Sequence, residues 1–423
     1  MAALNAVPQE AVTIPPDYAL HSMTSTRRIA TAWYAYGYLR EVVLIYPVYA
    51  IMMGEHGVSP LELSTLFFVW SASALIFEVP SGVLADRYSR KRLLVISGVL
   101  KGAAFIPWWF APDFSGYLTG FVVWSMGSSL VSGTSESFLY DTLRTAPHAK
   151  GEDRGFARIY GRGMVASSFG VATALAGGGY LAEHGYAWPL ALSIAAPWFA
   201  ALIVAIVFVE PPRGDTTRHE NVFGTLAAGV AEVRRSRVLL YIVAMFATLV
   251  TAYGVIDEYL GPFLNEKPAF TLGTVGLVYA ASFTTRTIGM EVAHRLPFRS
   301  LRAIANLFAI GTLGLGVTAL TNDLWLVVTY GWYFAASSAA EVLLQTRLQH
   351  EIDGSARATV TSIAKMAQHG AELLFYLYIG MIAQLWSFQT ALAAVAVLTF
   401  TLAIVFAAMA PARSRWTYPG ISG

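Results

Sequence analysis

The chain has 423 residues, of which 56% are hydrophobic and only 13% are charged. A soluble domain carries about 25% charged residues, so this deficit indicates a membrane protein. The formal net charge of +2 gives no reason to expect nucleic acid as a partner, and the absence of cysteine excludes disulfides, zinc–thiolate sites and thiol catalysis.

Twelve mostly apolar ranges are each long enough to cross a bilayer, which takes about 20 residues in a helix. They are residues 29–53, 60–85, 92–112, 116–143, 157–182, 187–209, 238–264, 271–296, 300–320, 323–347, 357–384 and 387–410. We therefore predict an all-α membrane protein with twelve transmembrane helices. Residues 1–22 lack the basic and apolar pattern of a signal peptide, so we expect the first span to be retained.

The basic residues between these spans predict how the chain lies in the membrane. With an inner N-terminus, nearly all Lys and Arg of the loops fall on the inner side, among them Arg27, Arg28 and Arg90, whereas the outer side holds only Lys267. Cytoplasmic loops carry an excess of Lys and Arg. We expect a multi-pass protein of the cell inner (cytoplasmic) membrane with both termini in the cytoplasm.

A polar connection divides the spans into six and six. Residues 1–212 are predicted to form an N-terminal six-helix bundle and residues 238–423 a C-terminal one. Between them, residues 213–237 form a cytoplasmic linker in which 222–233 can make an amphipathic helix on the inner leaflet.

The two halves resemble each other in the order of their polar residues. Residues 36–41 (YGYLRE) match 253–258 (YGVIDE), and Glu136 later matches Glu341. Parallel repeats of this kind predict two pseudo-symmetric bundles.

A basic turn follows the second span. Residues 77–92 have the sequence FEVPSGVLADRYSRKR, in which Gly82 is followed by Asp86, Arg87 and Arg90. Gly82 permits close helix packing. This pattern resembles the signature loop between helices 2 and 3 of the major facilitator superfamily of secondary transporters. The resemblance implies two pseudo-symmetric six-helix bundles that rock about a central site.

Four ionisable residues lie within two of the predicted spans. Arg40 and Glu41 are near the middle of the first, and Asp257 and Glu258 are at the matching place in the seventh. Charges inside a membrane are costly and mark functional sites. Helices 1, 4, 7 and 10 line the cavity in the family that the motif resembles, so these residues are expected at a substrate and proton site. The alternative is a static ion pair, such as Arg40 with Asp257.

Arg40 and Glu41 are neighbours in the sequence. Side chains at i and i+1 of a helix do not face each other. We therefore expect one of the two to point into the cavity and the other towards a neighbouring helix.

Other candidates for the substrate site lie in further spans. Arg286 can attract an anionic substrate, whereas for Lys101 we expect a structural ion pair. Tyr38, Trp332 and Tyr333 lie deep enough in their spans to stack on an organic ligand.

Charges near the inner ends of the spans are candidates for an inner gate. Glu136, Arg162, Glu341 and Lys365 occupy corresponding depths of the two halves. They can form pairs that break and re-form as the gate moves. The alternative is permanent pairing of Glu136 with Arg162 and of Glu341 with Lys365.

A second group of inner charges adjoins the basic turn. Asp141 and Arg144, together with Asp86 and Arg87, resemble the inner charge network of the family. Glu78, which precedes a proline in the second span, can bind a proton or pair with an arginine of this network.

The predicted function is secondary active transport of a small organic solute by alternating access. We expect proton coupling through Glu41 or Glu258, with export as the first direction and uptake of a metabolite or organic anion as the second. A membrane receptor on the same fold is a further alternative. An enzyme is not expected, because the sequence has neither an H-E-x-x-H motif nor a nucleotide-binding loop. We expect no cofactor or metal, a monomer, and the substrate, protons and lipid bilayer as partners.

Overall fold

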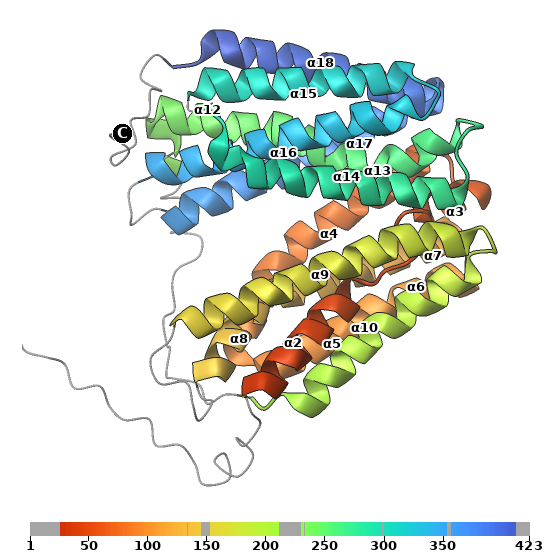
Figure 1. Cartoon of the computed structure of the whole chain (residues 1–423), viewed down its shortest axis with the longest axis vertical. Helices are drawn as coiled ribbons and strands as arrows, with labels where there is room; N and C mark the ends of the chain where they lie inside the picture. The colour runs from red at the N-terminus through yellow and green to blue at the C-terminus, as the bar shows by residue number, and fades with distance from the viewer. Residues whose placement is uncertain are drawn as a thin grey trace, which may run out of the picture.

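The computed structural model describes residues 26–132, 134–144, 153–210, 230–231, 233–297, 300–352 and 357–411. Over these ranges the chain forms helices and no strand, which confirms the predicted all-α fold. Figure 1 shows that the helices before residue 210 pack as one bundle and those after residue 236 as another. The predicted linker and its amphipathic helix at 222–233 lie largely outside the described residues, so the domain limits stay a prediction.

The bundles contain the following elements. In the first they are α2 (Thr26–Glu41), α3 (Tyr49–Glu55), α4 (Pro60–Arg87), α5 (Arg90–Ala103), α6 (Phe105–Phe110), α7 (Phe114–Val131), α8 (Thr134–Arg144), α9 (Asp153–Ala182) and α10 (Ala187–Val207). In the second they are α12 (Arg237–Met245), the π-helical turn η1 (Phe246–Val250), α13 (Thr251–Asn265), α14 (Leu272–Val292), the 3-10 turn η2 (Ala293–Arg295), α15 (Leu301–Leu320), α16 (Trp325–Glu351), α17 (Arg357–Leu385) and α18 (Phe388–Met409).

The described helices occupy all twelve predicted spans. By length and composition alone, seven of the helical stretches are long and apolar enough to cross a membrane. The other predicted spans are filled by α2 with α3, α7 with α8, α14, α16 and α17. Among them, α2, α7, α14 and α16 supply residues to the central cavity.

The first predicted span is not one helix. Helix α2 ends at Glu41, and residues 42–48 leave helical geometry before α3 begins at Tyr49. Pro47 lacks the N–H that would bond four residues back, and its ring disfavours helical backbone at the preceding residue. The prediction of an unbroken helix over 29–53 was therefore wrong.

The span at 238–264 is interrupted in a different way. A π-helical turn, η1, lies between α12 and α13. The Thr251 hydroxyl donates to the carbonyl of Phe246, five residues earlier, at 3.1 Å. Turns of this type are frequent at functional sites. The break in the first span follows Glu41, whereas this turn precedes the matching residue Glu258. The repeat is therefore not symmetric here.

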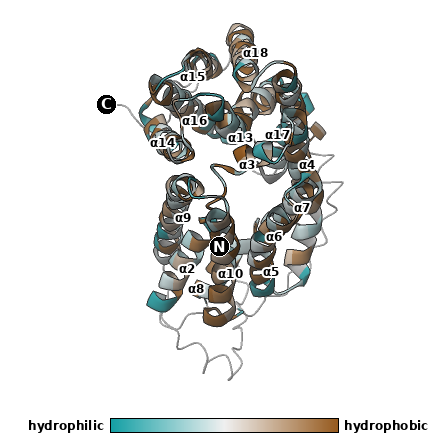
Figure 2. Cartoon of the chain, turned by 90° about the vertical axis from the view of Figure 1, so that its right-hand side faces the viewer, coloured by the Kyte–Doolittle hydropathy of each residue, from teal (hydrophilic) through white to brown (hydrophobic). Residues whose placement is uncertain are grey.

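The bundles meet along two helix pairs. Figure 2 shows α9 opposite α14 on one side of the molecule and α4 near α17 on the other. Gly179 on α9 lies against Gly276 on α14, and a Cβ added to Gly276 would lie 3.0 Å from the Cα of Gly179. This close approach is possible because neither residue has a side chain.

Candidate functional site

A cavity of about 250 Å³ lies between the two bundles. Its polar lining consists of Glu41, Tyr46, Lys101, Asp257, Tyr279 and Arg286. Its apolar lining consists of Val43, Trp124, Val171, Ala174, Leu175, Phe283 and Phe334. Three of the predicted site residues, Glu41, Asp257 and Arg286, are therefore brought together from both halves of the chain.

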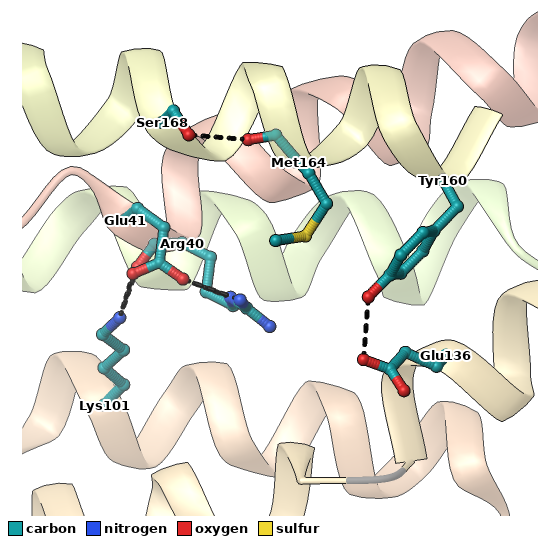
Figure 3. A network of polar contacts seen from close by, with 7 residues as sticks. All are labelled: Arg40, Glu41, Lys101, Glu136, Tyr160, Met164 and Ser168. Carbon is teal, nitrogen blue, oxygen red and sulfur yellow. Dashed lines mark hydrogen bonds and ion pairs between the residues drawn. The ribbon is translucent and has the colours of Figure 1, made fainter. Parts of the chain in front are cut away.

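On the first bundle, the cavity wall carries a three-residue charge network (Figure 3). Arg40 binds Glu41 through Nε at 2.9 Å and through a terminal nitrogen at 2.7 Å. Lys101 Nζ lies 3.3 Å from the other carboxylate oxygen of Glu41. Glu41 lines the cavity and Arg40 does not, as the expectation for one of the two requires, but among the described residues the side chain of Arg40 binds Glu41 and no neighbouring helix. The alternative pairing of Arg40 with Asp257 is also not formed.

Lys101 has a second role at the same place. Its Nζ donates to the backbone carbonyl of Arg40 at 2.6 Å. The last carbonyls of a helix lack partners within the helix, so a cation there satisfies one of them and opposes the helix dipole. Lys101 thus forms the structural pair that the sequence predicted, and it also lines the cavity.

On the second bundle, Asp257 and Arg286 face the cavity. The Arg286 guanidinium lies 5.3 Å from the centroid of the Tyr253 ring. The Tyr279 hydroxyl donates to the backbone carbonyl of Asp257 at 2.9 Å and so fixes α13 against α14.

Glu258 lies behind this wall and connects the two bundles. The hydroxyl of Tyr46 donates to Glu258 Oε1 at 3.0 Å, and the hydroxyl of Tyr49 donates to Oε2. Only 7% of Glu258 is exposed. Sequence reasoning did not assign Tyr46 and Tyr49 to the site. Their spacing on either side of Pro47 was the available signal.

The inner acidic residues do not form the permanent pairs considered as the alternative. Glu136 accepts a hydrogen bond from the Tyr160 hydroxyl at 2.9 Å (Figure 3), while Arg162 is exposed. Glu341 Oε2 is buried and has no hydrogen-bond partner among the described residues. The alternatives Glu136–Arg162 and Glu341–Lys365 are not formed, because Arg162 and Lys365 are exposed while Glu136 is bound by Tyr160.

The inner end of the first bundle holds the predicted network in part. Arg90 forms an ion pair with Asp141, and Arg144 lies 5.8 Å from the centroid of the Tyr140 ring. Arg87 and Glu78 are exposed. The surroundings of Gly82 and of the Asp86 side chain are not among the described features.

Glu210 was not predicted as part of this network. Its carboxylate accepts hydrogen bonds from the Ser89 hydroxyl at 2.6 Å and from the backbone N–H groups of Arg90 and Lys91 at 2.9 and 2.8 Å. It therefore caps the N-terminus of α5 from the end of α10.

The three aromatic candidates do not line the cavity. The Tyr38 hydroxyl is 3.3 Å from Thr173 Oγ1. Trp332 is 52% exposed on the outer face of its bundle, and its Nε1 donates to the Ile310 carbonyl at 3.2 Å. Tyr333 is buried 6.1 Å from Tyr253, ring to ring.

The aromatic side chains that do reach the cavity were missed. They are Tyr46, Trp124, Tyr279, Phe283 and Phe334. Within a helix that is apolar on every side, the sequence shows no periodicity that separates cavity-facing from lipid-facing positions.

Hydrogen bonds between the bundles lie from the middle of the molecule to the end that the sequence assigns to the outside. Besides the bonds to Glu258, Glu183 accepts hydrogen bonds from the Thr271 hydroxyl and the Gly273 N–H. Further bonds join Leu61 N–H to Gln384, the Ser64 hydroxyl to the Tyr259 hydroxyl, and the Ser71 hydroxyl to Glu372. The bundles are thus joined at their outer ends.

No group of three or more His, Asp or Glu side chains in the described part of the chain is arranged to hold a metal ion.

Comparison with known proteins gives a consistent assignment. A sequence profile of the Major Facilitator Superfamily matches residues 40–376. The MFS-type transporter YxaM of Bacillus subtilis (strain 168) is 25% identical over 281 residues, which are 62% of this chain and 65% of that relative. The match thus spans slightly less than two thirds of the relative's length.

Solved structures share the fold. The nucleoside transporter NupG superposes with a TM-score of 0.73 at 13% identity, covering 92% of this chain and 99% of that one. A bacterial homologue of the human lysosomal transporter Spinster, in an inward-facing and occupied conformation, has a TM-score of 0.70 at 14% identity, covering 96% and 100%. A D-xylose–proton symporter has a TM-score of 0.66 at 13% identity, covering 94% and 100%.

The profile match covers most of the chain and agrees with the basic turn after the second span and with the two-bundle architecture. This chain belongs to the major facilitator superfamily.

Proposed function

We propose that the chain is a proton-coupled secondary transporter that moves a small organic solute by alternating access. The solute binds in the cavity between Glu41 and Lys101 on one bundle and Asp257 and Arg286 on the other. The single observation that supports this most is that one cavity is lined by charged residues of both bundles. A ligand held there contacts both halves, so its binding affects how they move relative to each other.

Glu258 is the proposed coupling site. Glu41 is bound by two cations, Arg40 and Lys101, which favour its ionised form. Glu258 is buried and accepts hydrogen bonds only from neutral tyrosine hydroxyls among the contacts described. A protonated carboxyl group has fewer acceptor sites than a carboxylate. Protonation of Glu258 therefore weakens its bonds to Tyr46 and Tyr49 and loosens the contact between the bundles.

The inner charges are proposed to work as a gate. With both termini in the cytoplasm, the observed arrangement is closed on the outside. Closure of the inner end then brings the charged ends of α4, α8 and α9 towards those of the second bundle. The proposed gate residues of the first bundle are Glu78, Gly82, Asp86, Arg87, Arg90, Glu136, Asp141, Arg144 and Arg162. Those of the second bundle are Glu341 and Lys365.

The remaining aspects of the proposal come from the sequence. The protein works as a monomer in the inner membrane, and residues 213–237 connect its two bundles on the cytoplasmic side. Neither a cofactor nor a metal takes part.

Export is the first proposed direction. Uptake is the second candidate, and the charged lining of the cavity favours it, because such a lining suits a polar metabolite better than an apolar drug. Two of the structural relatives are described as a nucleoside transporter and a D-xylose–proton symporter, which is consistent with polar solutes. A receptor on the same fold would bind the solute without moving it.

Proton movement in proteoliposomes tests this proposal. A pH-sensitive dye is enclosed, a panel of solutes is added outside, and the wild type is compared with Glu258→Gln and Glu41→Gln. We expect solute-dependent proton flux in the wild type and its loss in Glu258→Gln, with solute exchange retained. The sign of the flux gives the direction of coupling. Glu291→Gln, at an exposed position, is the matched control and should behave as the wild type.

Two results would contradict the proposal. Unchanged proton flux in Glu258→Gln would exclude this residue as the coupling site. Solute binding without any movement into or out of the vesicles would support a receptor.

A further inference from the structure

The charges that line the central cavity cancel. Glu41 and Asp257 carry negative charges, and Lys101 and Arg286 carry positive ones. Bringing a net charge into a site of low dielectric is costly unless the site supplies an opposite charge. A neutral ligand with one group of each sign leaves the sum at zero and still pairs each group.

The two walls differ in how far their charges are already paired. On the first bundle, Lys101 and Arg40 both bind Glu41, so this group is satisfied internally. On the second, no carboxylate oxygen of the described residues lies within 4.0 Å of an Arg286 nitrogen. The planar guanidinium of Arg286 therefore has donors available for a ligand carboxylate, which it can bind through two parallel hydrogen bonds.

The Tyr253 ring lies beside Arg286, with its centroid 5.3 Å from the guanidinium. The Tyr253 hydroxyl and Glu341 Oε2 are buried without a hydrogen-bond partner among the described residues. Buried polar atoms are nearly always hydrogen-bonded in folded proteins. Neither residue lines the cavity, so these atoms mark incomplete polar packing behind Arg286.

The rest of the cavity is apolar and aromatic. Trp124, Phe283 and Phe334 come from three different helices and line the same space. Pockets for drug-sized ligands occupy about 300–1,000 Å³, whereas this cavity measures about 250 Å³. It therefore suits a small metabolite with an aromatic or branched apolar group.

We propose that the substrate is a small zwitterion of the amino-acid type, whose carboxylate binds Arg286, whose ammonium binds Asp257 and whose apolar side group lies against Trp124, Phe283 and Phe334. Asp257 on α13 and Arg286 on α14 line the same cavity, so one small ligand can present a group to each of them. This inference rests on the proposed function of the cavity and names its substrate class.

Three probes that differ by one charged group test the inference. L-Phenylalanine carries both groups, 3-phenylpropionate lacks the ammonium and 2-phenylethylamine lacks the carboxylate. Their binding to the full chain in lipid nanodiscs is measured by calorimetry at pH 7. A hydrogen bond to a charged group contributes about 1.5–3 kcal/mol. We therefore expect each analogue to bind about 10- to 100-fold more weakly than L-phenylalanine.

Variants assign the two groups to their partners. In Arg286→Gln, L-phenylalanine should bind no better than 2-phenylethylamine, while the binding of that amine is unchanged. In Asp257→Asn, L-phenylalanine should bind no better than 3-phenylpropionate. Arg286→Lys should keep part of the discrimination and shows that the variant site is folded. Arg295→Gln, beyond the end of α14, is the matched control and should leave all three affinities unchanged.

Equal affinities for the zwitterion and both analogues would overturn the inference. So would the absence of binding by L-phenylalanine, L-tyrosine, L-tryptophan and L-leucine while another solute is transported, a result that leaves the proposed function standing. Zwitterion binding without movement across proteoliposomes would support the inference and contradict the proposed function.

Discussion

The hydroxyl of Tyr49 donates a hydrogen bond to Glu258 across the interface between the two bundles. The two residues are 209 positions apart in the chain, and both are buried. Tyr46 holds the other oxygen of the same carboxylate. One acidic residue of the second bundle is thus bound by two tyrosines that lie on either side of Pro47 in the first.

Replacement of Tyr49 by Phe removes only the hydroxyl. Glu258 then loses one hydrogen bond, at a cost of about 1.5–3 kcal/mol for a charged acceptor. We expect a lower melting temperature in detergent and a smaller effect when Glu258→Gln is already present. Tyr180→Phe, at an exposed position, is the control. Equal destabilisation in both backgrounds would show that the hydroxyl acts independently of Glu258.

Replacement of Lys101 by Met breaks its bonds to Glu41 and to the Arg40 carbonyl. We expect the free energy of unfolding in mixed detergent to fall by about 1.5–3 kcal/mol, since a charge-assisted bond is lost and a helix end is left open. The double variant with Glu41→Gln should lose less than the sum of the two single variants. Strict additivity would mean that the pair contributes nothing through direct interaction.

Glycine at position 179 is predicted to be necessary for closure at the outer end. A Cβ there would overlap the Leu272 carbonyl oxygen and would lie 2.8 Å from the Cα of Gly276. We expect Gly179→Ala to separate α9 from α14. Gly177→Ala is the matched control, because its Cβ would lie 3.7 Å from Leu44 Cδ2, an ordinary contact.

The opening can be measured as a distance. The natural sequence has no cysteine, so spin labels at introduced cysteines replacing Trp188 and Leu324 report the separation of the bundles without background. Both positions are exposed. A longer mean distance is expected for Gly179→Ala only, and an unchanged distance would contradict the prediction.

Glu183 is predicted to make outer closure dependent on pH. The Glu183 carboxylate accepts hydrogen bonds from the Thr271 hydroxyl, which has the larger effect, and from the Gly273 N–H. These bonds, together with neighbouring His184, hold the pKa of Glu183 below its usual range. A lowered pKa stabilises the closed contact above the usual pKa of about 4.3, and this stabilisation is lost as the pH falls through the lowered value. Acidification on the outer side should therefore favour opening.

The same pair of spin labels checks this effect. The wild type should show a shorter distance at pH 7 than at pH 3.5, whereas Glu183→Gln should show little change between the two. The bond is exposed, so we expect a partial shift in population. A pH response that persists in Glu183→Gln would assign the titration to another group.

Hydrophobicity and charge order were sufficient to predict the membrane fold. A helix crosses a bilayer if it is long and apolar enough, which is a property of the local sequence. The basic turn at Arg87 and Arg90 and the matching acids at Glu41 and Glu258 are likewise visible along the chain. These features gave the family, the two-bundle architecture and three of the charged residues that line the cavity.

The partners of the charges were decided by the tertiary structure. Lys101 reaches Glu41 from a helix 60 positions away, and Tyr49 reaches Glu258 from the other bundle. The sequence did not predict that Arg40 and Glu41 bind each other, because it indicated an unbroken helix over 29–53, whereas α2 ends at Glu41. Trp332 and Phe334 are equally apolar in sequence, yet one faces outward and the other faces the cavity. The sequence by itself thus determined which segments cross the membrane, because that depends on length and hydropathy. Only the packing of distant helices determined which side chains meet, because an ion pair depends on distances that no local pattern contains.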